Sequence, residues 1–84
     1  MIMNNENDNN LVEINKQRIK HFFETKEIIH CTLKDGKFLN GLIFSVQDDF
    51  FEIHDRVDGV QPIFFIELKK RVMKFEEGTN ARNS

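Results

Sequence analysis

The sequence predicts a mainly β domain in which one N-terminal helix precedes a short, strongly bent antiparallel sheet of five strands. Two patterns support this fold class: a helical apolar spacing near the start, and short alternating runs separated by turn signals over residues 28–75. A third observation is Gly41, which interrupts the longest run, as at a bulge or a sharp bend. With 84 residues, the chain forms one domain and has no material for a second core.

The helix is expected over about residues 11–26. Asn10 is a suitable N-cap, and Glu13 follows at the spacing of a capping box. One apolar stripe interrupted by an arginine is formed by Leu11, Ile14, Arg18, Ile19, Phe22 and Phe23. Because so short a helix is unstable alone, it must dock on the rest of the domain. Residues 1–10, five of them Asn, and residues 76–84 are expected to be disordered tails.

The strands are expected over residues 28–34, 37–47, 50–56, a run that begins at Pro62, and 71–75. Asp35-Gly36 is a strong hairpin signal, because glycine adopts positive φ without penalty. In the second run, alternation places four apolar side chains on one face, namely Phe38, Leu42, Phe44 and Val46.

The fourth strand is unusual because it is apolar on both faces. Its residues are Ile63, Phe64, Phe65 and Ile66. An alternating strand can leave one face to water, but a continuous apolar run needs cover on both, and an exposed edge of this composition promotes aggregation. Either the helix or a second copy of the chain therefore covers it.

Composition narrows the classes of function. The net charge of −2 provides no global basic field for nucleic acid, so such a role would need a local patch. The single cysteine cannot form an internal disulfide, which suits a reducing compartment. No apolar run approaches the roughly 20 residues that span a bilayer, and the first residues lack the features of a signal peptide. We expect a cytoplasmic protein with no membrane partner.

Metal binding and catalysis are not indicated. His30, Cys31, His54 and Asp55 are candidate ligands, but His30 and Cys31 alternate across one strand, and no metal-binding spacing is present. The sequence also lacks an activated-nucleophile pattern and a glycine-rich phosphate loop. We therefore predict no enzyme activity, no metal and no cofactor.

Several segments together resemble the Sm-like domain family over about residues 11–75. The turn Leu33-Lys34-Asp35-Gly36, with Gly41 five residues later, matches the first Sm motif in type and spacing. Residues 48–53 are similar to its Asp-x-Phe-Met-Asn-Leu segment, although Glu52 stands where the family has a uridine-binding Asn. The second motif is partly present, and its Arg-Gly pair is missing. Lys69-Lys70 align with the Lys-His of the bacterial Hfq branch.

The resemblance implies a five-stranded barrel that assembles into a homo-oligomeric ring and binds single-stranded RNA. In that pattern Phe50 stacks on a base, Asp48 orients the pocket, and Lys69 and Lys70 meet phosphates. Strand four of one copy pairs with strand five of the next, and the candidate interface residues are Ile63, Phe64, Phe65, Ile66 and Val72.

Other interpretations of the same residues stay open. The basic triplet 69–71 also suits a solvated turn, and Phe50 also suits a core position in a chain with nine phenylalanines. A protein–protein scaffold that has lost the uridine pocket is the main alternative function. A barrel that binds DNA or a small ligand is a third.

Overall fold

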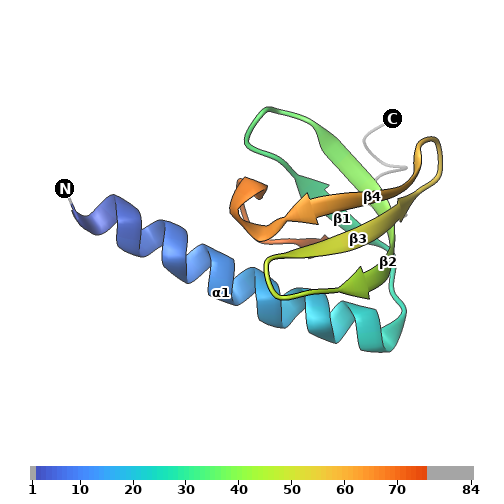
Figure 1. Cartoon of the computed structure of the whole chain (residues 1–84), viewed down its shortest axis with the longest axis horizontal. Coiled ribbons are helices and arrows are strands. Elements are labelled where there is room, and N and C mark those ends of the chain that lie inside the picture. The colour runs from blue at the N-terminus through green and yellow to red at the C-terminus, as the bar shows by residue number, and fades with distance from the viewer. Residues whose placement is uncertain (1, 76–84) are drawn as a thin grey trace.

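The computed structural model describes residues 2–75, with side chains described from residue 9, and shows one helix packed against one five-stranded antiparallel sheet (Figure 1). The elements are α1 (Ile2–Thr25), β1 (Ile29–Thr32), β2 (Phe38–Val46), β3 (Phe50–Asp55), β4 (Gly59–Phe64), the 3-10 helix η1 (Phe65–Glu67) and β5 (Met73–Lys74). The predicted class, mainly β with an N-terminal helix, is confirmed. The predicted tail at residues 76–84 lies outside the described residues.

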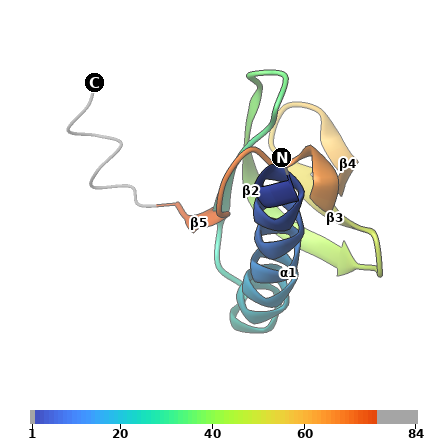
Figure 2. The same ribbon diagram turned by 90° about the vertical axis from the view of Figure 1, so that its left-hand side faces the viewer.

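The five strands form an open sheet and do not close into a barrel, so the predicted barrel is corrected. Their order is β4-β3-β2-β1-β5, which places β4 and β5 at the two edges. Figure 2, viewed along α1, shows these two edges on opposite sides of the molecule. Closure within one chain would require β4 to pair with β5, and β5 is only two residues long.

Helix α1 begins at Ile2, nine residues before its predicted start at Leu11. Asn10 therefore lies inside the helix, and the segment predicted as a disordered tail is helical from Ile2 onward. Residues 2–10 contain neither Gly nor Pro, so nothing in them breaks the helix, and each Asn costs only a fraction of a kcal/mol. The first half of α1 projects beyond the sheet (Figure 1).

The core lies between α1 and the inner face of the sheet. Ile19 and Phe22 of the helix pack there against buried side chains from the sheet and η1: Ile29, Cys31, Leu33, Leu39, Ile43, Phe51, Ile53, Ile63, Phe65, Leu68 and Val72. In β2 the residues that face the core are therefore Leu39 and Ile43. Phe38, Leu42 and Phe44 face outward.

A bulge explains why β2 does not follow one alternation throughout. Its pairing with β3 shifts in register between Ile43 and Ser45. The extra residue changes the face that later side chains occupy, so Val46 packs against the core whereas Phe44 is exposed.

Strand β4 begins earlier and ends earlier than predicted. It begins at Gly59, so Pro62 lies inside it, which is tolerated because β4 is an edge strand. The backbone turns at Phe65, whose N–H donates to the Asp49 carbonyl at 3.0 Å. Phe65 and Ile66 therefore belong to η1 and not to a strand.

The residues before β5 are fixed by side chains of the helix. Asn15 is fully buried: its Oδ1 accepts from the Val72 N–H at 2.8 Å, and its Nδ2 donates to the Lys70 carbonyl at 3.2 Å. Arg18 Nε donates to the Val72 carbonyl at 2.7 Å. Since each bond joins α1 to residues more than 50 positions later, the helix fixes the path of residues 70–72.

Candidate nucleic-acid interface

Phe50 and Phe64 form an aromatic pair on the outer face of the sheet. They are directly opposite each other on β3 and β4, and their ring centroids are 5.2 Å apart with a 41° tilt. Their neighbours Phe51 and Ile63 point into the core, which fixes the pair on the other face. Phe50 is half-buried and Phe64 is 42% exposed, so the pair presents aromatic surface to solvent.

Asp48 lies exposed in the turn immediately before Phe50. The Gln47 N–H donates to the Phe50 carbonyl at 2.8 Å and closes this turn, while the Asp49 carbonyl accepts from Phe65. The turn between β2 and β3 is thereby joined to the start of η1. Asp48, Phe50 and Phe64 thus lie in one region of the molecule.

Lys69 and Lys70 lie beyond the other end of η1, with exposed side chains. The Lys69 N–H donates to the Thr32 carbonyl at 2.8 Å, and the Lys70 carbonyl accepts from Asn15. Both lysines therefore extend from a fixed backbone into solvent. The structure places them at one end of the segment 65–69 and the aromatic pair at the other.

Glu52 lies two residues after Phe50 on the same face of β3. Its Oε1 accepts from the Ser45 hydroxyl at 2.6 Å, and its side chain is half-buried. Its cross-strand partner on β4 is Pro62. A carboxylate, which only accepts hydrogen bonds, therefore stands beside the aromatic pair.

The five candidate interface residues divide into two groups. The side chains of Ile63, Phe65 and Val72 are buried in the core of the single chain, so they face its interior and not an open surface. Phe64 and Ile66 are exposed, Ile66 by 65%, and lie at the end of the edge strand and just after it. Within one chain, the buried side chains of this run, Ile63 and Phe65, are covered by the core that Ile19 and Phe22 of α1 help to form.

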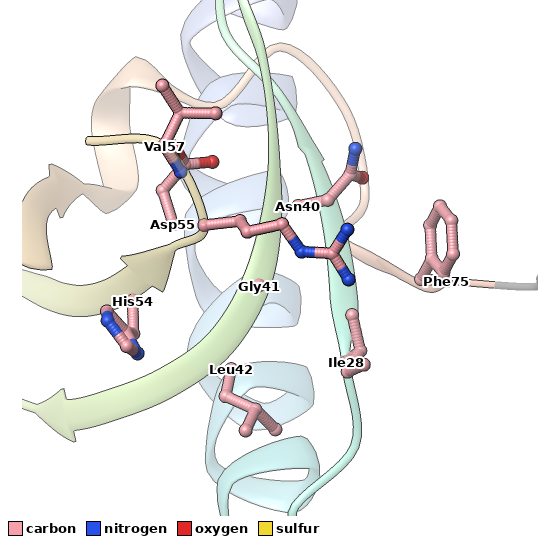
Figure 3. A pocket seen from close by; sticks show the side chains of 9 residues that line it. Ile28, Asn40, Gly41, Leu42, His54, Asp55, Val57 and Phe75 are labelled. Carbon is pink, nitrogen blue, oxygen red and sulfur yellow. Dashed lines mark hydrogen bonds between the residues drawn. The ribbon is translucent and has the colours of Figure 1, made fainter. Parts of the chain in front are cut away.

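Two features were not predicted from the sequence. One is Asn15, whose signal was its place in the apolar stripe, four residues before Ile19 and seven before Phe22. The other is a groove of about 590 Å³ on the face of the sheet away from α1 (Figure 3). It is lined by Ile28, Asn40, Gly41, Leu42, His54, Asp55, Arg56, Val57 and Phe75. It brings residue 28 together with the end of the described chain, a proximity that the alternation of single strands does not encode.

The described residues contain no group of three or more His, Cys, Asp or Glu side chains suited to a metal ion. Cys31 is buried, and desolvation raises the pKa of its thiol to about 12, so at neutral pH it is not a thiolate nucleophile. His30 faces the opposite side of β1, where Nδ1 lies 2.6 Å from Asn40 Oδ1 and the ring stacks on Phe38. These residues are explained by packing and hydrogen bonding.

No family model matches the chain, and neither a curated protein nor a solved structure matches it. Within the described part of the chain, no helix combines the length and the apolar character needed to cross a membrane. The resemblance to the Sm-like family thus stays a prediction, as do cytoplasmic location and the absence of enzyme activity.

Proposed function

We propose that this protein is an Sm-like protein that assembles into a homo-oligomeric ring and binds single-stranded RNA. The observation that carries the proposal is the strand order β4-β3-β2-β1-β5 after an N-terminal helix. This order places β4 and β5 at the two edges of the sheet. These are the two strands that, by the resemblance, pair between neighbouring copies. Unpaired strand edges are templates for pairing with another chain, and a head-to-tail contact that repeats by rotation closes into a ring.

The hydrogen-bond pattern of β4 supports pairing at its open edge. The Phe65 N–H donates to Asp49, next to the Phe50–Phe64 pair. In an antiparallel ladder, backbone groups alternate in direction, so the N–H and C=O of Phe64 point away from β3. Pro62 has the same orientation and no N–H, which leaves the end of β4 near Phe64 as the segment best able to add a strand.

The aromatic pair and the lysines support RNA binding. Stacking of a base on an aromatic ring contributes roughly 1–3 kcal/mol, and Phe50 with Phe64 offers such a surface. Lys69 and Lys70 supply local positive charge that a ring would repeat in each copy, although the chain is acidic overall. Contacts of lysine with phosphate release counterions and give an affinity that falls with salt.

Replacing Phe64 with proline is expected to abolish assembly. The backbone of Phe64, at φ −79° and ψ 140°, already suits proline, so the substitution removes the outward N–H with little strain. Light scattering at micromolar concentration should give a multiple of the 10.0 kDa chain mass for the wild type and a single chain mass for Phe64→Pro. The matched control is Phe64→Ala, which removes the ring but keeps the N–H and should still assemble. A wild-type monomer contradicts the ring.

Replacing Lys69 and Lys70 with alanine is expected to weaken RNA binding by one to two orders of magnitude at low salt, because two phosphate contacts are lost. The slope of log affinity against log salt should also fall by about 0.7 for each lost contact with a single strand. Anisotropy titrations of oligo-U and oligo-A across a salt series should compare wild type with Lys69→Ala/Lys70→Ala. The control Lys20→Ala/Arg56→Ala removes the same charge from exposed sites elsewhere. The RNA function fails if neither oligo-U nor oligo-A binds the wild type at low salt, or if both double variants lose affinity for RNA equally.

A protein–protein scaffold is the second candidate, favoured by one specific observation. The outer face of β2 exposes Phe38, Leu42 and Phe44, and the groove that Leu42 helps to line is partly apolar. Exposed apolar patches often mark protein-binding surfaces. This function gains support if the wild type assembles and yet binds neither oligo-U nor oligo-A in the salt series.

A further inference from the structure

The outer face near the end of β4 combines a solvent-facing aromatic pair, whose rings are tilted by 41°, with a carboxylate. Phe50 and Phe64 form its aromatic pair, and Glu52 lies two residues along the same strand, about 7 Å from Phe50. Phe44, 61% exposed, lies at the bulge next to Ser45, the cross-strand partner of Glu52. A planar ring system that stacks on Phe50 would have one edge toward the Glu52 carboxylate.

The hydrogen bond from Ser45 limits the positions that Glu52 can adopt. Its hydroxyl donates to Oε1 at 2.6 Å, and the pairing of β2 with β3 fixes Ser45 opposite Glu52. A carboxylate has about four acceptor sites on its two oxygens and no donor. One bond from Ser45 therefore leaves acceptor capacity on both oxygens of a side chain that is held in place.

We propose that Glu52 makes this site select guanine, and the proposal rests on the RNA-binding function above. Guanine presents two adjacent donors, N1–H and the N2 amino group, which match the two oxygens of one carboxylate. Uracil presents one donor between two acceptor oxygens, and adenine and cytosine each present an amino donor beside an acceptor nitrogen. A carboxylate therefore pairs fully with guanine alone, whereas the other three bases place an acceptor against it.

The surroundings favour a nucleic-acid base over a charged peptide side chain. An arginine side chain would also satisfy a carboxylate and stack on phenylalanine. However, Lys69 and Lys70 lie just beyond η1 on a fixed backbone, where they suit the phosphates of a bound strand and would repel a basic peptide. The lysines and the aromatic pair together fit a polyanion with planar bases.

The test uses the full-length protein and U-rich RNA octamers that differ at one central base. Anisotropy titrations at fixed low salt should show the octamer with guanine binding roughly tenfold tighter than those with U, A or C, since a bidentate pair discriminates strongly between bases. Inosine, which lacks the N2 amino group, should lose most of this advantage. The inosine comparison is made on the wild type, so it remains informative if a variant fails to fold.

The variant Glu52→Gln should abolish the preference for guanine and raise the affinity for the all-U octamer, because an amide can donate to a uracil oxygen. Glu24→Gln, exposed near the end of α1, removes the same charge and should change nothing. Equal binding of all four bases by the wild type overturns guanine selection and leaves RNA binding intact. If no octamer binds, both proposals fail. The site would then be assigned to a protein partner if a labelled arginine-containing peptide binds and N-acetylarginine amide displaces it.

Discussion

Replacing Gly41 with alanine is expected to destabilise the domain by about 3 kcal/mol or more. A Cβ at this position would lie 2.2 Å from the carbonyl oxygen and 2.9 Å from the carbonyl carbon of His54. Both are backbone atoms of the neighbouring strand β3, so no side-chain rotation relieves the contact. Since Gly41 pairs with Ile29 on one side and Asp55 on the other, β2 can retreat from β3 only by disturbing β1.

Urea unfolding followed by circular dichroism, at one protein concentration, measures this loss. Gly59→Ala is the matched control, because its Cβ would meet nothing within 4 Å and its cost comes only from a φ of +81°. That left-handed conformation costs a residue with a side chain about 1–2 kcal/mol. Equal losses in the two variants would show that the close approach of β2 and β3 at Gly41 is not the cause.

The prediction for Gly41 also shows which parts of the fold the sequence determines locally. A glycine inside an alternating run predicts close backbone approach or a bend, and the structure has such an approach at Gly41. The turn at Asp35-Gly36 was equally clear, with Gly36 at a φ of +93°. Both predictions depend on the absence of a Cβ in glycine, which permits close approach at Gly41 and positive φ at Gly36, so they need no knowledge of distant contacts.

The orientation of β2 could not be predicted in the same way. This strand is apolar on both faces, with Leu39 and Ile43 on one side and Phe38, Leu42 and Phe44 on the other. Alternation alone therefore fits two opposite orientations, and the more aromatic set lies outside. The choice is made by packing: Leu39 and Ile43 meet the core beneath α1, which is information about long-range contacts.

The candidate site was predictable residue by residue but not as an arrangement. The exposure of Lys69 and Lys70 follows from their charge. The pairing of Phe50 with Phe64 depends on the register of β3 with β4. The end of the fourth strand at Phe64 depends on the hydrogen bond between Phe65 and Asp49, two residues far apart in the sequence. Register and tertiary hydrogen bonds are set by the folded domain and leave little trace in local periodicity.

Replacing Asn15 with leucine is expected to cost about 2–4 kcal/mol, because it leaves one buried and one partly buried backbone group without their partner. Asn15 is 0% exposed, and its amide serves both the Val72 N–H and the Lys70 carbonyl. Leucine fills a similar volume, so the loss reports on hydrogen bonding and not on a cavity. Because these bonds also fix the backbone that carries the basic side chains, the proposed binding of RNA should weaken in parallel with the loss of stability.

Asn15→Asp gives a pH-dependent version of the same test. One oxygen of the carboxyl can still accept from Val72, but the other would face the Lys70 carbonyl, and burial disfavours the charge. The pKa of the introduced carboxyl should therefore be higher in the folded protein than its unfolded value of about 3.9. A raised folded pKa means that the folded state binds the proton more tightly. The variant should thus regain stability as pH falls through the folded pKa toward 3.9, and lose it as pH rises through the same window.

Urea unfolding of wild type and Asn15→Asp between pH 4 and pH 8 tests this expectation. The difference between their free energies of unfolding should narrow toward low pH. Asn10→Asp is the control, because Asn10 is exposed on the same helix and its substitution should change stability by less than about 0.5 kcal/mol. A difference between Asn15→Asp and wild type that is constant with pH would show that the carboxyl ionises freely. The helix would then not enclose residues 70–72 as tightly as the two hydrogen bonds of Asn15 indicate, and the fixed position of the lysines would need another cause.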